Sequence, residues 1–422
     1  MAVWGSSAPN PLSSPPVSAG PTGSALWDFI VPGTDPSAEQ YVPRLVDALL
    51  LRSRELRASD IHLRPAAEEW QIDLRIDGVL QRMGSLPVEL GKRCLTRLKV
   101  MASLLTYRND IPQDGRVRTA GSSTANESSV AETRISTFPT LFGEQAVVRL
   151  FADEDRLAVL DQLGLPDDIL QRLRQELQET GGVILLTGPA GSGKTTTIYA
   201  SLREILNKSR GGRHLITLED PIESVVGGVT QSQVNPQAGL DLTTGLKAIL
   251  RQDPDVIMVG EIRDSAVAET VFQAALTGHL VLTTYHAGSA AAAINRLCDM
   301  GIEPYLLRSG LRLILCQRLF RRLCACARPA EARPAEDSWQ AVGCGQCDGT
   351  GYRGRFLLAE ALSPEHDAVG QAIVQREQTA SLEQIARSAG MIALQDRAEE
   401  AIAQGLTTRE EVWRVLGGRG GK

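Results

Sequence analysis

The stretch TGPAGSGKTTT, residues Thr187–Thr197, contains the complete pattern G-x-x-x-x-G-K-[ST] between Gly188 and Thr195. The apolar run VILLT precedes it and predicts a buried strand, while TTTIYASLREILNKS predicts a helix that begins inside the stretch. In such a strand–loop–helix unit the backbone N–H groups of the loop face phosphate oxygens, beside the positive end of the helix dipole. The stretch therefore predicts a loop that binds the phosphates of a nucleotide.

Two side chains of this phosphate loop are expected to act on the nucleotide directly. Lys194 would bridge the β- and γ-phosphates, and the hydroxyl of Thr195 would bind Mg²⁺. A glycine-rich turn that binds nothing is the alternative, and the strand before the loop and the helix after it argue against that alternative. The residues predicted to contact ATP and Mg²⁺ are Gly188, Pro189, Ala190, Gly191, Ser192, Gly193, Lys194, Thr195 and Thr196.

Further apolar runs, HLITLE, VIMVG and HLVLTTY, alternate with helical stretches, which predicts a parallel sheet covered by helices. Two of these runs lead to acids, because Glu219 closes the first and Glu261 follows the second. An acid at the carboxyl end of a parallel strand lies in the crevice where ligands bind. We therefore predict that Glu261 polarises the attacking water and that Glu219 takes part in catalysis. The alternative for Glu261 is an acid stabilised by a helix dipole.

The sequence contains five histidines, and two of them flank the run LVLTTY. His279 precedes this predicted strand and His286 follows it, on the side of the presumed nucleotide site. We predict that His286 senses the γ-phosphate, and a structural role is the alternative for both histidines.

Four of the seven cysteines form two close pairs, C-x-C and C-x-x-C, separated by 17 residues. Two such pairs of thiolates can surround a Zn²⁺ ion tetrahedrally, and free thiols are the alternative. A thioredoxin-like redox pair is disfavoured because that motif opens a helix in a βαβ unit. Cys94, Cys298 and Cys316 lie in helical patterns and are expected to be small buried side chains. The predicted zinc ligands are Cys324, Cys326, Cys344 and Cys347.

The charge of the chain and one basic run bear on its partners. The formal net charge is −6, which argues mildly against a general nucleic-acid coat, so no direct nucleic-acid partner is expected. The run LFRRLCACAR is interpreted as a solvated helix face, with contact to nucleic acid or anionic lipid as the alternatives. No apolar run reaches the roughly 20 residues that a bilayer requires, and the start lacks a signal sequence, which predicts a cytosolic protein.

The length of 422 residues predicts several domains. A serine- and proline-rich start predicts disorder, because such a segment buries little apolar surface. The hairpin signal Asp77-Gly78, and a second hairpin around QDGRVRT and AETRIST, predict a strand-rich domain in which AGSSTANESS is a surface loop. The predicted organisation is a disordered segment 1–39, an α+β domain 40–152, a linker and helix 153–180, a nucleotide-binding domain 181–320, a zinc module 321–358 and a C-terminal helical region 359–422.

Together these motifs make the chain resemble the secretion ATPases of type II secretion and type IV pilus assembly, from about Ala58 to Gly417. The segments that carry the resemblance are ASDIHLRP, LRIDGVL, PQDGRV, RISTFPTLFGE and VVRL, and then GPAGSGKTTT, LEDPIE, RQDPDVIMVGEIRD and TGHLVLTTYHAG. The four-cysteine module followed by GYRGR is similar to the zinc motif of the secretion and pilus-extension branches of that family.

The resemblance implies an α/β fold with a RecA-like P-loop NTPase core, a smaller α+β, PAS-like N-terminal domain, a four-cysteine zinc module and a C-terminal helical region. It also implies a homohexameric motor that hydrolyses ATP at the cytoplasmic face of the inner membrane, with platform and docking proteins of a secretion or pilus machine as partners. Two arginines that reach the phosphates in the family correspond to Arg116 in QDGR and Arg134 in RIST. The extra N-terminal domain with which many members dock is not expected here.

We expect a motor for pseudopilus assembly in type II secretion, with type IV pilus assembly as the closest alternative. Two interpretations from other classes are a nucleotide-gated scaffold that does not hydrolyse ATP and a DNA-translocating ATPase. Intact Lys194, Thr195 and Glu261 argue against the scaffold. The acidic balance and the lack of a recognisable DNA-binding module argue against the translocase.

Overall fold

The computed structural model describes residues 38–119, 131–150, 159–329 and 339–418. The chain forms two compact units, one ending at Asp153 and the other beginning at Glu154. The predicted disordered N-terminus, except for its last two residues, and the loop AGSSTANESS lie outside the described residues. No helix within the described ranges is both long enough and apolar enough to cross a membrane.

The first unit is a six-stranded sheet whose strands lie in the order β3-β2-β1-β6-β5-β4. Each neighbouring pair is antiparallel. The predicted turn at Asp77-Gly78 joins β2 to β3, and helices α2 and α3 share one apolar core with the sheet. The elements are α2 (Tyr41–Glu55), β1 (Ala58–Pro65), β2 (Glu69–Ile76), β3 (Val79–Pro87), α3 (Val88–Met101), β4 (Gln113–Thr119), β5 (Ala131–Thr140) and β6 (Gly143–Leu150).

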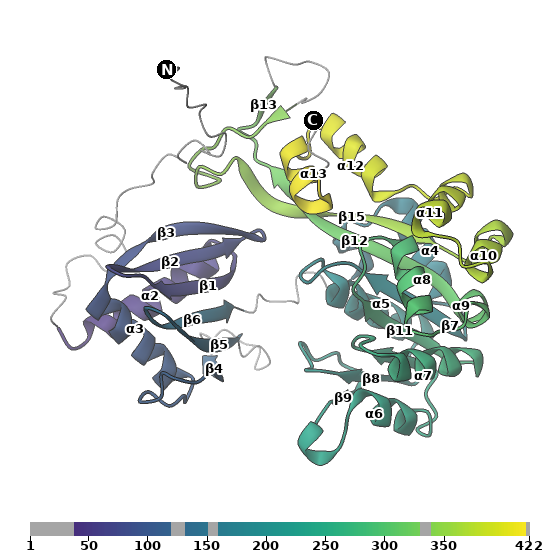
Figure 1. Ribbon diagram of the computed structural model, residues 1–422, viewed down its shortest axis with the longest axis horizontal. Helices are drawn as coiled ribbons and strands as arrows, with labels where there is room; N and C mark the ends of the chain where they lie inside the picture. The colour runs from purple at the N-terminus through teal and green to yellow at the C-terminus, as the bar shows by residue number, and fades with distance from the viewer. Residues whose placement is uncertain (1–37, 120–130, 151–158, 330–338, 419–422) are drawn as a thin grey trace, which may run out of the picture. The chain divides into compact units, whose positions relative to one another are not determined.

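The second unit is built on a seven-stranded sheet with the order β15-β12-β7-β11-β10-β8-β9. Neighbouring strands of this sheet are parallel, except that the edge strand β15 is antiparallel to β12. The predicted parallel sheet is therefore confirmed (Figure 1). Its strands are β7 (Gly182–Thr187), β8 (Leu215–Glu219), β9 (Thr230–Gln233), β10 (Val256–Val259), β11 (Leu280–Tyr285), β12 (Leu311–Leu323) and β15 (Tyr352–Leu362).

Helices cover both faces of this sheet, and the central strand β7 has apolar side chains on each face. Val183 and Leu185 belong to one apolar core, whereas Ile184 and Leu186 belong to the other, and none of the four side chains is exposed. Side chains alternate between the faces of a strand, so a strand covered on both sides is apolar throughout. The helices are α4 (Asp167–Glu176), α5 (Lys194–Ser209), α6 (Leu242–Ile249), α7 (Ser265–Leu276), α8 (Ala290–Asp299), α9 (Pro304–Gly310), α10 (Asp367–Val374), α11 (Thr379–Ser388), α12 (Leu394–Ala403) and α13 (Arg409–Leu416).

Strand β12 differs from the expectation drawn from the sequence. Cys316 and the start of the basic run after it were predicted to be helical, and this is wrong, because both lie in the strand between β7 and β15. A strand buried on both faces lacks the alternation that distinguishes it from a helix. Cys94 in α3 and Cys298 in α8 are helical and buried, as predicted. Strands β12 and β15 also run through the expected boundaries of the zinc module at 320/321 and 358/359.

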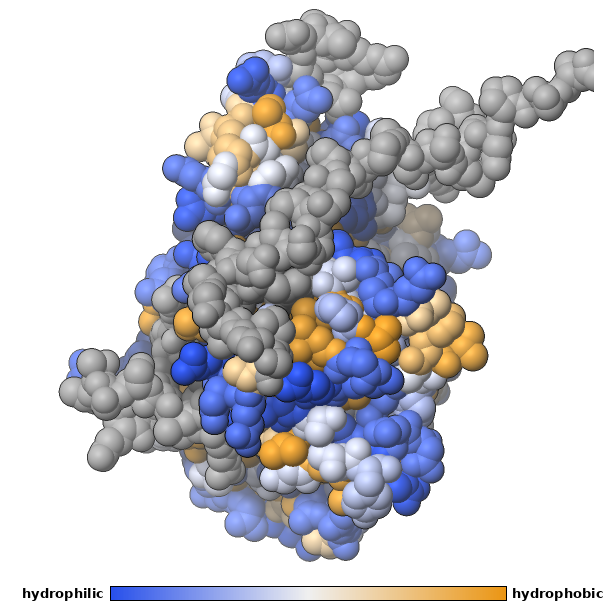
Figure 2. Space-filling view, turned by 90° about the vertical axis from the view of Figure 1, so that its left-hand side faces the viewer, coloured by the Kyte–Doolittle hydropathy of each residue, from blue (hydrophilic) through white to orange (hydrophobic). Residues whose placement is uncertain are grey.

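On the face shown in Figure 2, hydrophobic groups gather in small patches among hydrophilic ones. In the first unit, exposed apolar side chains include Leu105 and Tyr107 in the segment between α3 and β4, and Leu141 and Phe142 in the turn between β5 and β6. Leu141 is 90% exposed, so the apolar side chain of this turn does not pack into the core of its own unit.

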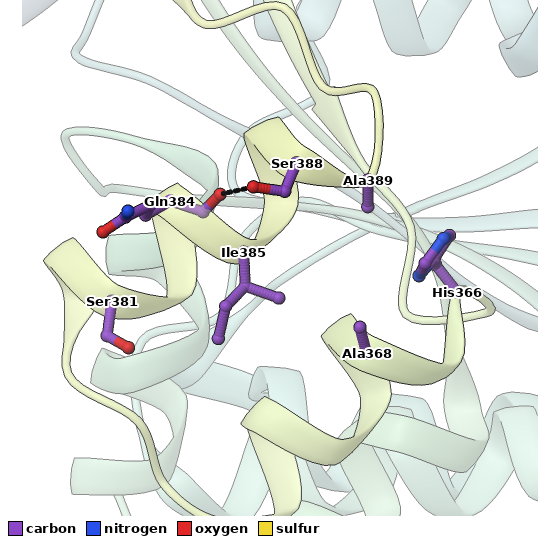
Figure 3. Close-up of a pocket in the computed structure, with 7 residues that line it drawn as sticks. All are labelled: His366, Ala368, Ser381, Gln384, Ile385, Ser388 and Ala389. Atoms are coloured by element: carbon purple, nitrogen blue, oxygen red, sulfur yellow. Dashed lines mark hydrogen bonds between the residues drawn. The ribbon is translucent and has the colours of Figure 1, made fainter.

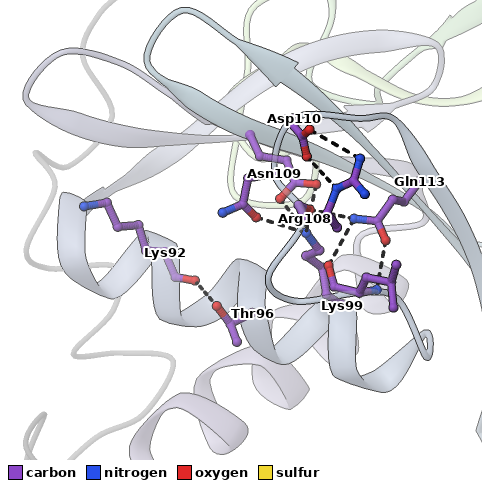
Figure 4. Close-up of polar contacts among 9 residues, drawn as sticks. Lys92, Thr96, Lys99, Arg108, Asn109, Asp110 and Gln113 are labelled. Carbon is purple, nitrogen blue, oxygen red and sulfur yellow. Dashed lines mark hydrogen bonds and ion pairs between the residues drawn. The ribbon is translucent and has the colours of Figure 1, made fainter.

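Lys99 joins the segment between α3 and β4 to the start of β6, from inside the first unit (Figure 4). Its ammonium donates hydrogen bonds to both carboxylate oxygens of Glu144, at 3.1 and 2.8 Å, and both side chains are 1% exposed. It also donates to the carbonyl of Arg108 at 2.7 Å and to Oδ1 of Asn109 at 3.2 Å. Gln113 donates to the same Arg108 carbonyl at 2.8 Å. The segment that leads into β4 is therefore fixed by buried charge and hydrogen bonds.

Candidate functional site

The phosphate loop connects β7, which ends at Thr187, to α5, which begins at Lys194. Gly188 opens the loop with φ of 145°, a conformation that favours glycine. A Cβ atom at Gly188 would lie 2.6 Å from both the carbonyl oxygen of Gln317 and Oγ of Ser192. The backbone approaches its neighbours too closely there for any side chain, so this position requires glycine.

Lys194 is buried, and its side chain turns back onto the loop. Its Nζ donates hydrogen bonds of 2.9 Å to the carbonyl oxygens of Gly188 and Pro189. Burial lowers the pKa of the Lys194 ammonium, the carboxylate of Glu261 opposes that effect, and the guanidinium of Arg318 adds to it. Thr195 and Thr196 follow in the first turn of α5 and are partly exposed. The ammonium is thus held at the mouth of the loop, where phosphate oxygens can replace the carbonyls as its partners.

Gln317 of β12 supports the loop from behind. Its Nε2 donates to the carbonyl of Ser192 at 2.9 Å, and its Oε1 accepts a hydrogen bond of 3.2 Å from Thr197 of α5. The side chain is completely buried. Gln317 is not among the residues predicted from the sequence, because the pattern of β12 did not identify it as a strand of the sheet. Its one signal in the sequence is a polar amide within the apolar run LILCQRLF.

Glu261 and His286 come together at the ends of neighbouring strands. Glu261 lies two residues beyond β10, and His286 directly follows β11. Nε2 of His286 lies 3.5 Å from Oε2 of Glu261, and their side chains are 53% and 29% exposed. Arg263 donates to Glu261 through Nε and to Asp220 through Nη1, the latter at 2.9 Å. These residues and Lys194 stand at the carboxyl edge of the parallel sheet, which suits them to a bound nucleotide.

Glu219 ends β8 and is 3% exposed. It accepts hydrogen bonds from the hydroxyl of Tyr199, from Oγ1 of Thr217 at 2.6 Å and from Nε2 of Gln231 at 3.1 Å. Burial and the Glu219 hydrogen bond raise the pKa of the Tyr199 phenol. Tyr199 lies on α5, so these contacts join the helix that follows the phosphate loop to β8. They favour a role for Glu219 in holding α5 rather than in touching the nucleotide.

Arg116 and Arg134 belong to the first unit and lie directly opposite each other on β4 and β5. Arg149 of β6 continues the same row, opposite Arg134, and its Nε donates to Asp60 at 3.0 Å. Residues directly opposite on neighbouring strands point to the same face of a sheet. Three guanidinium side chains therefore share one face of the first unit, on the side away from helices α2 and α3, because Ile135 and Val148 occupy the helix-covered side.

The four predicted zinc ligands lie in one cluster, and all of their sulfurs are within 4.8 Å of one another. Three pairs are 3.8 Å apart, namely Cys324 with Cys344, Cys326 with Cys347 and Cys344 with Cys347. A tetrahedron with Zn–S bonds of about 2.3 Å has edges of about 3.8 Å. The backbone N–H groups of Cys344 and Gly351 donate to the sulfur of Cys347 at 3.1 and 3.2 Å. Such bonds stabilise a thiolate, so these residues fit a structural zinc ion.

The zinc cluster is joined to helix α13 through charged and aromatic contacts. Arg321 stacks on the ring of Tyr352, with 4.0 Å to its centre, and bonds to buried Glu411 at 2.7 Å. The hydroxyls of Tyr352 and Thr408 are 2.7 Å apart. Any disturbance of the cluster should therefore reach the C-terminal helices.

We expect that chelation, or Cys344→Ser, releases one zinc ion per chain and loosens the segment from Cys324 to Arg355 and α13. Metal binding energy contributes to local folding where the ligands surround the ion, so limited proteolysis should cut this region faster. Nucleotide binding should persist, because no cysteine of the cluster contacts the phosphate loop. Cys298→Ala, at a buried cysteine outside the cluster, is the control. Elemental analysis that finds no metal in freshly purified protein would contradict the zinc assignment.

A hollow of about 360 Å³ lies between helices α10 and α11, lined by residues that include His366, Ala368 and Ile385 (Figure 3). All of its lining residues come from His366–Ala389, and none belongs to the phosphate loop or to the strand ends that carry Glu261 and His286. This hollow is therefore separate from the nucleotide site.

Strand, glycine loop and helix, with an acid at a neighbouring strand end, define a P-loop ATPase. The chain belongs to the type II/IV secretion system protein family, whose sequence model matches residues 35–414. The resemblance inferred from the motifs, the α/β fold and the ATPase activity are thereby confirmed.

The relatives of this chain include proteins of two machines. The chain is 40% identical over 376 residues to the type II secretion system protein HxcR of Pseudomonas aeruginosa, covering 89% of this chain and 77% of that protein. It is 37% identical over 393 residues to the type IV pilus assembly ATPase PilB of Thermus thermophilus, covering 89% of this chain and 42% of that protein. The relatives thus include both secretion and pilus proteins.

Solved structures agree with the fold. The pilus retraction motor PilT with bound ADP matches with a TM-score of 0.57 and 25% identity, over 88% of this chain and 96% of that one. The ATPase DotB of Legionella pneumophila matches with a TM-score of 0.66 over 91% of this chain and 98% of that one. At 20% identity, DotB supports the fold alone.

Proposed function

We propose that this chain is the ATP-hydrolysing motor of a type II secretion system, where it powers the assembly of a pseudopilus. The observation that carries the proposal is the extent of the similarity to type II secretion proteins, 40% identity over 77% of the length of HxcR. The similarity to PilB of Thermus thermophilus, at 37% identity over 42% of its length, favours type IV pilus assembly as the second candidate.

The proposed chemistry assigns one task to each residue of the site. The backbone of residues 188–196 and the ammonium of Lys194 bind the phosphates, and Thr195 binds Mg²⁺. Glu261 polarises the attacking water, and His286 contacts the γ-phosphate from the next strand end. Glu219 holds α5 through Tyr199, as the hydrogen bond between their side chains supports. Arg116 and Arg134 bring positive charge to the nucleotide phosphates when the motor is assembled.

The proposed assembly is a homohexamer at the cytoplasmic face of the inner membrane. Platform and docking proteins of the secretion machine are the proposed partners, and no nucleic acid is needed. The exposed apolar turn with Leu141 and Phe142 supports contact with another protein. The ring would pass the shape change that accompanies ATP turnover to the membrane platform.

Deletion of the gene tests the choice between the two machines. We expect the deletion strain to keep secreted proteins inside the cell envelope and to retain surface pili. The wild-type gene should restore secretion, and a Lys194→Ala gene expressed at the same level should not. Immunoblots of culture medium and counts of surface pili measure the two outcomes. Loss of pili with normal secretion would instead assign the chain to pilus assembly.

A further inference from the structure

A buried arginine of β12 lies against the phosphate loop, and no motif of the sequence marks it. Arg318 is 8% exposed. It stands two residues beyond Cys316, which is in register with Thr187, the last residue of β7. The Nη1 atom of Arg318 lies 3.2 Å from the position that a Cβ at Gly188 would occupy. The guanidinium therefore reaches the first residue of the loop.

The same guanidinium also contacts the segment that carries His286. Its Nη2 donates a hydrogen bond of 2.7 Å to the carbonyl oxygen of Gly288, two residues after His286. Its Nη1 donates to the carbonyl of Gln317 at 3.3 Å. The backbone N–H of Ala287 donates to Oγ1 of Thr187 at 2.9 Å, which ties the segment to β7 as well. Arg318 thus binds the segment 286–288 through Gly288 and lies beside Gly188, the first residue of the phosphate loop.

The partners of the Arg318 guanidinium are neutral groups in the part of the chain that the structure describes. Among the described residues, no carboxylate lies within ion-pair distance of its guanidinium, whose partners are carbonyl oxygens and the sulfur of Cys316 at 3.8 Å. The charge of Glu360 interacts with that of Arg318, but both oxygens of Glu360 already accept backbone bonds, from Ala290 at 2.8 Å and Leu394 at 3.0 Å. A buried cation without an acidic partner is costly, and nucleotide phosphates would offset that cost.

We propose that Arg318 is a positioning residue of the ATPase site, which locks the segment 286–288 against the phosphate loop so that His286 keeps its place beside the γ-phosphate. The geometry suits a side chain with two donors on one planar group, because Nη2 binds the Gly288 carbonyl after β11, while Nη1 faces the Gln317 carbonyl and the start of the phosphate loop. The inference rests on the proposed role of His286. It does not depend on whether the motor serves secretion or pili.

Steady-state ATPase assays on the purified full chain test the proposal. We expect Arg318→Met to lower kcat about 10-fold or more and to change KM for ATP less than about threefold, because the loop amides and Lys194 still bind phosphate. Arg318→Lys keeps the positive charge on a single donor nitrogen, so its kcat should be higher than that of Arg318→Met. The lysine variant replaces the methionine variant in the assay if the latter folds poorly. Arg322→Met is the matched control, since Arg322 lies on the same strand with an exposed side chain.

A double-mutant cycle with His286→Gln separates positioning from simple support of the fold. If Arg318 acts through His286, the double variant should be no slower than the slower single variant, because the second change removes nothing more. Three results would overturn the proposal. The first is a double variant in which the two losses of kcat multiply, and the second is turnover at the parent rate in Arg318→Met or, if that variant does not fold, in Arg318→Lys. The third is a slow Arg318→Met variant together with a His286→Gln variant that keeps the parent rate. All of these are measured on ATP turnover, so a failed secretion assay leaves them unaffected.

Discussion

Replacing Glu261 with glutamine is expected to lower ATP turnover by about 10²- to 10³-fold while nucleotide binding persists. The amide has nearly the same size as the carboxylate, but it cannot accept a proton from the attacking water or polarise it. Glu261 lies beyond the end of β10 with His286 3.5 Å away, so its carboxylate has a partner that can hold it toward the γ-phosphate. The variant should therefore accumulate with ATP bound.

Single-turnover assays with radiolabelled ATP, together with a filter-binding measurement, separate the two effects in Glu261→Gln. Glu269→Gln is the control, because it makes the same chemical change at an exposed acid on the neighbouring helix α7. Turnover at the parent rate in Glu261→Gln would show that another group activates the water, and the assignment of the site would need to be changed.

The phosphate loop could be predicted because its chemistry is local. A strand, a glycine-rich turn and a helix N-terminus follow one another within one stretch, and each has its own signal. Gln317, which hydrogen-bonds to that loop, and Arg318, which lies beside it, could not be predicted in the same way. They act from β12, which pairs with β7 from far along the chain, and a strand apolar on both faces resembles a helix segment. The same cause explains why Cys316 was assigned to a helix and why Gln317 and Arg318 were not predicted as residues of the site.

The cysteine grouping lies between these cases. The spacing of the two pairs predicted that the sulfurs would meet, and the structure brings all four within 4.8 Å. The spacing carried no information on the link from Arg321 through Glu411 to α13, because that contact joins residues that are distant in the sequence. Spacing predicts ligands that a short chain segment can fold around an ion, whereas the surrounding contacts depend on the tertiary fold.

Arg116→Ala and Arg134→Ala are each expected to cut ATP turnover by about 10²-fold, as the loss of a charge that stabilises the transition state does. The two side chains lie directly opposite each other on β4 and β5, so their planar groups can serve one anion together. The segment that leads into β4 is fixed by the buried pair of Lys99 and Glu144, which limits the conformations open to this row. Affinity for ATP should change much less, because Lys194 and the loop amides remain.

The two arginine variants should be assayed as assembled rings, because the proposal requires these side chains to meet the phosphates of a closed motor. Arg52→Ala is the control, since Arg52 is an exposed arginine on α2 paired with Glu55 at 3.0 Å. If the arginines distinguish ATP from ADP, each variant should also lose part of the difference in affinity between the two nucleotides, because only ATP carries the γ-phosphate that they would contact. Near-normal hydrolysis in both variants would show that Arg116 and Arg134 are surface charges of the first unit with no role in turnover.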